Sequence, residues 1–463
     1  MASQVAFGSV NPATEQDIAR WPVADAAARD RALDAAVDAF RAGRDRSPED
    51  RAALLRSVAA ELRSRRIALA ATATAEMGKP RGEALAEVDK CATACEYFAE
   101  HGAAMLADEP HPSNATQSYV SYLPLGVIFA VMPWNYPYWQ VIRHAAPAVM
   151  AGNAILVKHA ENTLGCAAGL TDVFTAAGAH PGLLAHVVAT IDDSAGIIGD
   201  GRVAAVTLTG STRAGSAVAT LAGKSLKKTV LELGGSDAFV VLADADVAAA
   251  AKTAVRARFQ NAGQSCIAAK RFIVERTVAD EFIDAFIAGA ADLQVGDPAQ
   301  DGVDLGPMAR DDLRAGLARQ RAESIAGGTK ELLVGGPRDG VGWYFDPSVL
   351  LVEDLSVPAW REETFGPLAP IHVVDSAERA LAVVNDSIYG LGGAVWTGDL
   401  DRGRAFARHV ESGAMFVNGM TASYPELPFG GVKQSGYGRE LARAGIVEFT
   451  NQQTVWVAPP SGI

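Results

Sequence analysis

The sequence predicts an α/β fold with two doubly wound parallel sheets and a small additional β element. Short, continuous apolar segments alternate with helical segments in two successive series, which is typical of buried parallel strands joined by helical crossovers. In two further segments, near residues 117 and 450, aromatic or β-branched residues alternate with small polar residues, as they do in β-hairpins. The chain has 463 residues, of which 49% are hydrophobic, enough for roughly three domain-sized units.

The first part of the chain, from Met1 to about Ala107, is predicted to be helical. Examples are Ala26–Ala42 and Ser47–Met77, where Ala, Leu, Arg and Glu dominate and apolar residues recur every three or four positions. We therefore expect a layer of amphipathic helices before the first sheet.

Two series of strands follow. The first is predicted at Val127–Met132, Ala154–Val157, Ala185–Ala189, Ala204–Thr209 and Thr229–Leu233, with helices such as Gln140–Ala151, Leu164–Ala177 and Arg213–Ala222 between them. The second is predicted at Ala238–Leu242, Arg271–Val274, Pro370–Val374, Ala394–Thr397 and Met415–Asn418. Each series predicts one doubly wound sheet.

The small β element is predicted from two segments far apart in the chain. Gln117–Phe129 has the alternation of a hairpin, and Thr450–Ala458 shows the same alternation near the other end. We expect these segments to pair as an outlying sheet.

Polar side chains follow the strands of the first series. Asn135, Lys158, Ser211 and Glu232 each stand at or just after a strand end. Because parallel sheets bind ligands beyond the carboxyl ends of their strands, we expect these four side chains to face one crevice. No GxGxxG motif occurs, since Gly210 to Gly215 has the wrong spacing, but phosphates could bind at the helix start beside Ser211.

Cys266 and Glu232 are the candidate chemical groups. Cys266 follows a predicted helix end at Gly263, and it is either a nucleophile or a small buried hydrophobic residue. Glu232 places a carboxyl group in an apolar strand, where burial would suit it to general base catalysis; an edge strand in water or a structural ion pair are the alternatives. Asn135, held between two prolines, is either a turn former or a fixed donor for an oxyanion hole.

Composition limits the partners and the location. A formal net charge of -13 and a pI near 5.2 argue against nucleic acid and favour a small-molecule partner. No export signal or membrane span is visible in the sequence, and the four cysteines form no CxxC pair. We therefore expect a cytoplasmic protein with reduced thiols. No histidine or cysteine motif of zinc spacing occurs, so no metal is expected.

Seven motifs together resemble the aldehyde dehydrogenase superfamily, from about residue 8 to about residue 458. They are MPWNYP, VKHAE, LTGS, LELGG, FQNAGQSC, EETFGP and PFGGVKQSGYGRE. The segments SVNPAT, VKHA and PFGGVKQSGYGRE are most similar to the NAD-type succinate semialdehyde dehydrogenases.

The resemblance implies a role for each matching residue. Cys266 would be the nucleophile, Glu232 the general base, and Asn135 an oxyanion donor together with the backbone N–H of Cys266. The implied reaction oxidises an aldehyde through a thiohemiacetal and a thioester on the cysteine. The cofactor-binding residues would be Trp134, Lys158, Glu161, Gly210, Ser211, Leu233, Glu363 and Phe365.

The cofactor and substrate expectations follow from the same comparison. The Glu161 carboxylate would repel the 2′-phosphate of NADP, so NAD is expected over NADP. Arg143 matches a carboxylate-binding arginine of semialdehyde dehydrogenases, whereas Gln260 stands where their second arginine would be. We expect Arg143, helped by Gln260 and Ser423, to bind the distal carboxylate of succinate semialdehyde.

The expected organisation is a dinucleotide-binding domain (residues 1–105 and 124–234), a catalytic domain (235–449) and an oligomerisation element (106–123 and 450–463). A homodimer or homotetramer is expected. Three alternatives remain open: a dehydrogenase for another short aliphatic or aromatic aldehyde, a cysteine esterase or hydrolase, and an inactive binding protein. A CoA-acylating relative is disfavoured because such enzymes dispense with the base that Glu232 would supply.

Overall fold

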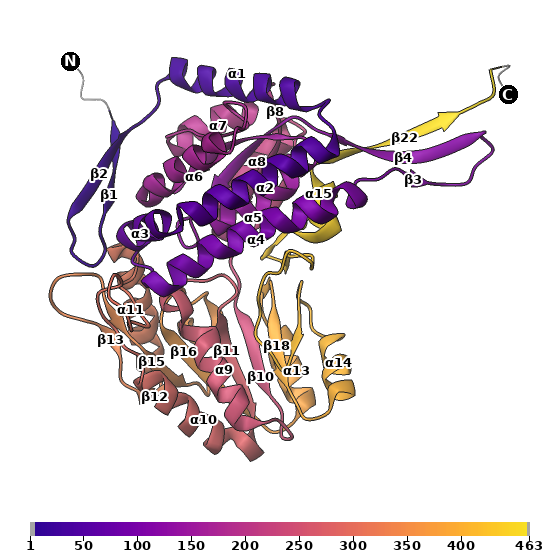
Figure 1. Cartoon of the computed structure of the whole chain (residues 1–463). Coiled ribbons are helices and arrows are strands. Elements are labelled where there is room, and N and C mark those ends of the chain that lie inside the picture. The colour runs from indigo at the N-terminus through magenta and orange to yellow at the C-terminus, as the bar shows by residue number, and fades with distance from the viewer. Residues whose placement is uncertain (1–4, 461–463) are drawn as a thin grey trace.

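The computed structural model describes residues 5–460 and contains two large sheets, one above the other in Figure 1. Both sheets are mainly parallel and carry helices on their faces, as the sequence predicts. The active-site candidates Glu232 and Cys266 lie in the region where the two halves meet.

The upper sheet has six strands in the order β21-β9-β8-β5-β6-β7. All neighbours pair in parallel except β21, which is antiparallel to β9. The strands are β5 (Val127–Met132), β6 (Ala154–His159), β7 (Leu184–His186), β8 (Val203–Thr209), β9 (Lys228–Glu232) and β21 (Gly436–Tyr437). Thus the first predicted series is confirmed, with β7 shorter than expected.

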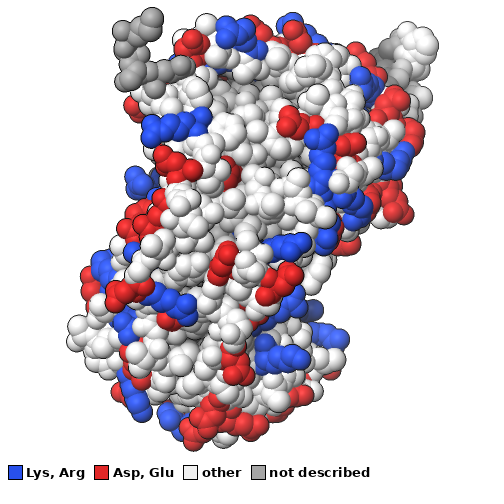
Figure 2. Space-filling view, turned by 60° about the vertical axis from the view of Figure 1, so that its left-hand side comes forward, with Lys and Arg blue, Asp and Glu red and all other residues white. Residues whose placement is uncertain are grey.

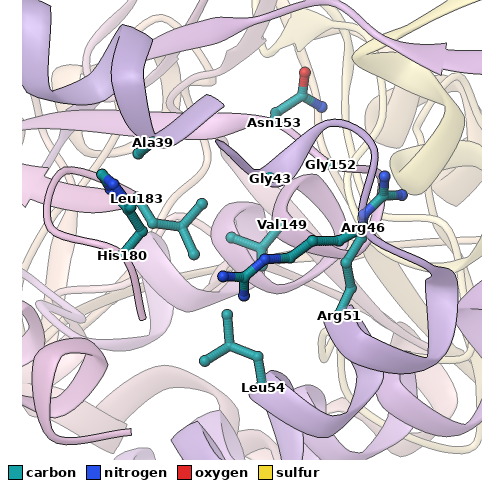
Figure 3. A pocket seen from close by; sticks show the side chains of 10 residues that line it. All are labelled: Ala39, Gly43, Arg46, Arg51, Leu54, Val149, Gly152, Asn153, His180 and Leu183. Atoms are coloured by element: carbon teal, nitrogen blue, oxygen red, sulfur yellow. The ribbon is translucent and has the colours of Figure 1, made fainter. Parts of the chain in front are cut away.

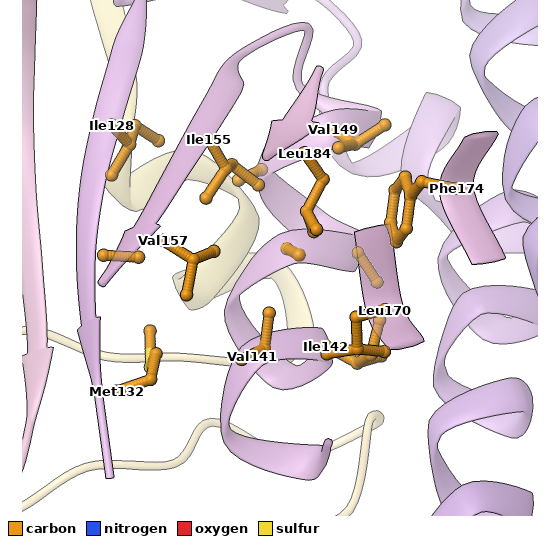
Figure 4. Close-up of a cluster of buried hydrophobic side chains, with 14 of the residues drawn as sticks. Ile128, Met132, Val141, Ile142, Val149, Ile155, Val157, Leu170, Phe174 and Leu184 are labelled. Carbon is orange, nitrogen blue, oxygen red and sulfur yellow. The ribbon is translucent and has the colours of Figure 1, made fainter. Parts of the chain in front are cut away.

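Helices cover this sheet because its strands are apolar on both faces. In Figure 4, Ile128, Met132, Ile155 and Val157 from the strands pack with Val141 and Ile142 of α5 and with Leu170 and Phe174 of α6. The helices are α5 (Trp139–Met150), α6 (Leu164–Ala176), α7 (Ile191–Gly199) and α8 (Thr212–Lys224), with α1 (Ala26–Gly43), α2 (Pro48–Ser64), α3 (Arg66–Met77) and α4 (Arg81–Met105) before them. Helix α4 packs against α2 and α5, and so comes close to the catalytic region.

The lower sheet has seven strands in the order β12-β15-β16-β11-β10-β18-β19, parallel except for β12. The strands are β10 (Asp237–Val241), β11 (Ala269–Glu275), β12 (Lys330–Leu333), β15 (Ser348–Leu351), β16 (Leu368–Val374), β18 (Gly393–Trp396) and β19 (Phe416–Val417). Its helices are α9 (Val247–Phe259), α10 (Arg276–Ala291), α11 (Asp311–Ala326), α12 (Pro358–Arg361), α13 (Ala377–Asn385) and α14 (Leu400–Ala407). The second predicted series is therefore confirmed.

The predicted outlying sheet forms, but the hairpin expected over Gln117–Phe129 does not, because β5 pairs with β6 and β8 in the upper sheet. Strand β22 (Thr450–Val457) pairs antiparallel with β4 (Gln117–Pro124) along its whole length, and β3 (Glu109–Pro110) adds a third strand. The strands extend away from the body in Figure 1, and α15 (Ala442–Glu448) leads into β22. The last three residues of the predicted element, 461–463, lie outside the described residues.

The expectation of helix throughout the first hundred residues is wrong near the start. Strands β1 (Ala6–Val10) and β2 (Asp17–Pro22) form a hairpin instead. Tertiary contacts hold this hairpin in place. The Ser9 hydroxyl donates to Glu76 of α3 at 2.9 Å and accepts from the Trp21 indole N–H at 3.0 Å. Short pairs also form between β13 (Gly336–Pro337) and β14 (Phe345–Asp346), and between β17 (Tyr389–Gly390) and β20 (Val432–Lys433).

The predicted helix Ser47–Met77 is two helices. The chain leaves helical geometry at Arg65, where φ is -98° and ψ is 7°, and α3 begins at the next residue. Ser47 caps α2 with a capping box to Asp50, so the predicted start is right.

Candidate active site

The turn before Cys266 is strained and held in place. After α9, a 3₁₀ segment η2 (Gln260–Gly263) carries left-handed backbone at Asn261 (φ 53°), Ala262 (φ 52°) and Gly263 (φ 72°). Only glycine adopts this region freely, so the surrounding contacts must hold the other two residues there. Glu83 accepts the Asn261 N–H at 2.7 Å, and Arg258 donates to the Gly263 carbonyl at 3.0 Å. The turn thus fixes the chain that carries Cys266.

Cys266 is half-buried and lines a pocket of about 720 Å³. Lys270 of β11 donates to the carbonyls of Ser265 (2.8 Å) and Cys266 (2.7 Å) and pairs with Glu363 at 3.3 Å. Burial raises the pKa of the Cys266 thiol to about 11, although the charges of Arg143 and Lys270 act in the opposite direction. The other three cysteines are fully buried, so Cys266 is the thiol placed for chemistry.

Asn135 lies beside this turn as an amide donor. Its side-chain Nδ2 donates to the backbone carbonyl of Gln264 at 3.0 Å. The backbone carbonyl of Asn135 accepts from Asn261 Nδ2 at 2.8 Å. A side-chain amide has two N–H groups, so one remains for a ligand. Within the described residues, the backbone N–H of Cys266 has no protein acceptor either. Asn135 is thus anchored to the turn, with one side-chain N–H free for the oxyanion role that remains a prediction.

Glu232 stands at the end of β9 and is 2% exposed. Strand β9 is paired on both sides, which rules out the edge-strand alternative. Neither carboxylate oxygen of Glu232 has a hydrogen-bond partner among the described residues. Burial raises the pKa of Glu232 well above its usual value, while Arg143 lowers it and Glu440 raises it further. A Cβ on Gly430 would lie 2.8 Å from Glu232 Oε1, so glycine is needed there to leave the carboxylate room.

Arg143 on α5 lies in the same pocket but already has an acidic partner. Its Nε pairs with Glu440, its Nη2 donates weakly to Thr209 Oγ1 at 3.4 Å, and its guanidinium lies 4.5 Å from the Phe429 ring centroid. The expectation that Arg143, helped by Gln260 and Ser423, binds a substrate carboxylate does not account for this pairing. Glu440 is the last residue of the PFGGVKQSGYGRE motif, and no feature of the sequence marks it as buried.

Ser423 and Gln260, the other two residues predicted to bind the substrate, both line this pocket. The Ser423 hydroxyl accepts from the Trp139 indole N–H at 3.1 Å and from Lys90 Nζ at 2.8 Å. Lys90 comes from α4, in the helical first part of the chain, and sequence reasoning missed it because nothing in its local pattern distinguishes it from a solvated lysine.

The predicted cofactor residues of the upper sheet lie along one edge. Trp134 follows β5, Lys158 lies in β6, Glu161 begins the 3₁₀ segment η1 (Glu161–Thr163), Gly210 and Ser211 follow β8, and Leu233 follows β9. Ser211 caps α8 and accepts the Ala214 N–H at 3.3 Å. This edge offers helix-start amides, hydroxyls, a lysine and a carboxylate, a donor set that fits a dinucleotide.

The histidine of VKHAE orders the loop before Glu161. The His159 ring contacts the Pro137 carbonyl at 2.9 Å, and the Ala160 N–H donates to the ring at 2.9 Å. Burial lowers the pKa of His159 to about 4, so the ring is neutral at physiological pH. Lys158 and Glu161 thus keep the positions that the motif predicts, and the charge of Glu161 acts on Lys158.

Glu363 and Phe365 approach the same edge from the lower sheet. Glu363 accepts the Gly235 N–H at 3.0 Å, and a Cβ on Gly234 would lie 2.3 Å from its Oε2. Phe365 meets Trp134 edge to face, with ring centroids 5.7 Å apart. The LELGG glycines are therefore needed for close approach of the two halves, and the predicted cofactor residues from both halves meet.

A second, smaller pocket lies between α1, α2 and the loop before β6, away from these groups. In Figure 3, Arg46 reaches across it toward Leu54 and Val149, with Arg51 and His180 at its sides. It contains no thiol or carboxylate and takes no part in the site above.

On the face shown in Figure 2, acidic and basic side chains are interspersed. Within residues 5–460, no group of His, Cys, Asp or Glu side chains is arranged to hold a metal ion. In the same part of the chain, no helix is long and apolar enough to cross a membrane.

Comparison with known proteins gives consistent matches over the whole chain. The profile of the aldehyde dehydrogenase family matches residues 1–455. The chain is 47% identical over 448 residues to succinate semialdehyde dehydrogenase [NAD(P)+] Sad of Escherichia coli K12, covering 97% of each chain. It is 44% identical over 454 residues to a probable succinate-semialdehyde dehydrogenase [NADP(+)] of Synechocystis, covering 98% of this chain and 100% of the relative.

A solved structure agrees with these sequence matches. Succinic semialdehyde dehydrogenase of Streptococcus pyogenes, in complex with NADP+, superposes with a TM-score of 0.95 at 35% identity, covering 98% of this chain and 100% of that chain. The match includes both sheets and the outlying β element, because nearly the full length is aligned.

Proposed function

Since the chain belongs to the aldehyde dehydrogenase family, we propose that it oxidises succinate semialdehyde to succinate and uses NAD in preference to NADP. The observation that carries the proposal is that Cys266 lines one pocket with Arg143 and Lys90, on a turn to which Asn135 is anchored, while Arg143 also acts on the buried carboxyl group of Glu232.

Cys266 is the proposed nucleophile. Its thiolate sulfur bonds to the aldehyde carbon, and the electron pair of the C=O double bond moves to the oxygen. The backbone N–H of Cys266 and the remaining N–H of Asn135 Nδ2 stabilise that oxyanion. The strained η2 turn supports this step because it fixes the sulfur and both donors relative to one another.

The oxidation needs a hydride acceptor beside Cys266. A nicotinamide dinucleotide supplies that chemistry when bound. The residues proposed to hold it are Trp134, Lys158, Glu161, Gly210, Ser211, Leu233, Glu363 and Phe365, which lie along the edge where the two halves meet.

Glu232 is the proposed base for hydrolysis. In its ionised form it takes a proton from water, the hydroxide adds to the thioester carbon, and the C–S bond breaks to release the carboxylic acid and the Cys266 thiolate. Its burial and raised pKa suit a base that must accept a proton near neutral pH.

The preference for NAD rests on Glu161. Its side chain is exposed at the start of η1, where an adenosine ribose would lie if the dinucleotide follows the sheet edge. A 2′-phosphate there would be repelled by the carboxylate, whereas a ribose hydroxyl could donate to it. The relatives are named for NADP(+) or NAD(P)+, so this residue is where the cofactor choice of this chain is to be tested.

The choice of substrate rests on the pocket charge and on the relatives' names. Arg143 and Lys90 both line the pocket with Cys266, in a chain whose net charge is -13. Because Arg143 already pairs with Glu440, the charge of Lys90, which belongs to no ion pair among residues 5–460, is the one that favours an anionic aldehyde here.

The organisation of the chain is proposed to match these roles. The upper sheet with its helices (residues 1–105 and 124–234) binds the dinucleotide, and the lower half (235–449) carries the nucleophile. The outlying sheet exposes Leu123, Trp456 and Val457, each at least 40% exposed, which supports a role for it in forming a homodimer or homotetramer.

One steady-state comparison tests the proposal. The purified protein is assayed with succinate semialdehyde and with pentanal, an uncharged aldehyde of similar length, using NAD or NADP, and reduced nicotinamide is followed by absorbance. The proposal expects the highest kcat/KM for succinate semialdehyde with NAD. Equal efficiency on both aldehydes contradicts the proposed substrate. Faster turnover with NADP contradicts the proposed preference for NAD.

A further inference from the structure

We propose that Lys90 is the residue that binds the distal carboxylate of the substrate, together with the hydroxyl of Ser423. This inference rests on the proposed function, because it names the group by which the same pocket selects an aldehyde that carries a carboxylate.

The position of Lys90 is the first argument. Lys90 lies on α4 and lines the pocket together with Cys266. Its Nζ is 4.1 Å from the Trp139 ring centroid and 2.8 Å from Ser423 Oγ. The ring and the hydroxyl fix the ammonium at the pocket wall, which reduces the side-chain entropy that binding would otherwise cost.

The second argument is that Lys90 has no acidic partner, whereas its buried neighbours do. Arg143 pairs with Glu440, Lys79 with Glu87, and Lys270 with Glu363. Glu87 lies one helical turn from Lys90, but its carboxylate already pairs with Lys79. It also accepts hydrogen bonds from the backbone N–H groups of Tyr138 and Trp139. Among the ion pairs of residues 5–460, none includes Lys90.

The third argument is the hydrogen-bond count at Ser423. A hydroxyl can accept two hydrogen bonds and donate one. Ser423 Oγ accepts from Trp139 Nε1 (3.1 Å) and from Lys90 Nζ (2.8 Å), so both of its acceptor positions are used. Its proton has no acceptor among the described residues and remains to be donated. A carboxylate accepts but cannot donate, so it fits this arrangement of one O–H and the remaining N–H groups of an ammonium.

Lys90 also supplies a charge that the nucleophile turn lacks. Gln260 lines the same pocket six residues before Cys266 and is uncharged. A cation from α4 can therefore take over the role that a charged residue at position 260 would fill, although the two positions lie far apart in the sequence.

The electrostatic state of Lys90 agrees with a binding role. Burial lowers its pKa to about 8, and the charge of Arg143 acts in the same direction, while Glu87, Cys91 and Cys266 raise it. An ammonium in such a place is costly until a counter-ion arrives. A bound carboxylate provides that counter-ion and stabilises the protonated form.

The test compares Lys90→Met with a matched control. Methionine keeps the apolar stem against Trp139 but removes the charge, and Lys90→Arg restores it. Lys252→Met makes the same change of charge at an exposed position of the same pocket. For Lys90→Met we expect kcat/KM for succinate semialdehyde to fall about ten- to a hundredfold, through KM, with a much smaller loss on pentanal. Lys90→Arg should recover most of this loss. Lys252→Met should change kcat/KM for either aldehyde by less than about threefold.

Binding of the product, succinate, measured by calorimetry, gives a readout that does not depend on turnover. We expect wild-type affinity for succinate to decrease as the pH rises through about 8, because the ammonium loses its proton, and Lys90→Met to bind weakly at every pH. Circular dichroism and melting temperature establish that the variant is folded.

Two different results separate the two proposals. If wild type prefers succinate semialdehyde to pentanal and Lys90→Met keeps that preference, the inference about Lys90 is wrong while the function stands. If wild type shows no such preference and does not bind succinate, the proposed substrate itself is wrong.

Discussion

The guanidinium of Arg143 pairs with the carboxylate of Glu440 at a point where each side chain is 2% exposed. Helix α5 supplies the arginine, and the segment before α15 supplies the glutamate. Glu232 lies close enough that Arg143 lowers its pKa and Glu440 raises it. The charge of Arg143 thus acts on two buried carboxyl groups, those of Glu440 and Glu232.

Arg143→Met should destabilise the protein because it leaves Glu440 buried without a counter-charge. Loss of one member of a buried pair costs about 3–5 kcal/mol. The double variant Arg143→Met/Glu440→Gln should be much closer to wild type, since the unpaired charge is gone. Urea denaturation of wild type, Arg143→Met, Glu440→Gln and the double variant measures the coupling; additive effects would show that the pair is not energetically linked.

Cys266→Ala should abolish aldehyde oxidation, because no other thiol can form the covalent intermediate. The fold and cofactor binding should remain, since Cys266 is only half-buried and its turn is held by other residues. Activity is measured by absorbance of reduced nicotinamide and cofactor binding by fluorescence. A variant with near-normal turnover would remove Cys266 from the mechanism.

The pH dependence of thiol alkylation should follow the raised pKa of Cys266. Because burial raises that pKa to about 11, the thiol is protonated at neutral pH in the protein without cofactor. The rate of reaction with iodoacetamide should therefore keep rising from pH 7 to about 10, as the thiolate fraction grows. Cys266→Ala is the control. A rate that levels off near pH 8 would mean that the thiolate is stabilised more strongly than this environment allows.

Glu232→Gln should separate the two halves of the reaction. Hydride transfer needs no base at position 232, but thioester hydrolysis does, so a burst of reduced cofactor should precede a steady rate at least tenfold below wild type. In wild type, the hydrolysis rate should increase with pH as Glu232 ionises, at higher pH than an ordinary glutamate would, because burial raises its pKa. Stopped-flow absorbance measures both phases; an unchanged steady rate excludes Glu232 as the base.

Glu161→Ser should raise kcat/KM with NADP by about tenfold or more, because it removes a negative charge beside the expected 2′-phosphate. Efficiency with NAD should fall modestly as a ribose contact is lost. Glu362→Gln, on the lower half, changes a side chain that is 44% exposed and pairs with Arg319, and it tests for a general effect of charge. Wild type that uses both cofactors equally would show that Glu161 does not discriminate between them.

Much of the fold could be predicted from the sequence. Strands β5 and β8 appear at or within one residue of the predicted bounds because their continuous apolar segments can be stable only inside a covered parallel sheet. The hairpin of β1 and β2 could not be predicted, since its short, partly exposed strands depend on contacts of Ser9 and Trp21 with each other and with α3. The break at Arg65 also escaped detection, because the residues on both sides favour helix.

The sequence by itself determined the family, the two sheets, and the identities of Cys266, Glu232 and Asn135 as candidate groups, because each belongs to a local motif or breaks a local pattern. Tertiary structure alone decided what surrounds them. The pairing of Arg143 with Glu440, the pairing of Lys270 with Glu363, and the position of Lys90 beside Ser423 all join distant segments. Burial and charge pairing depend on distances in space, so no local pattern could have shown which cation of the pocket remains without a partner.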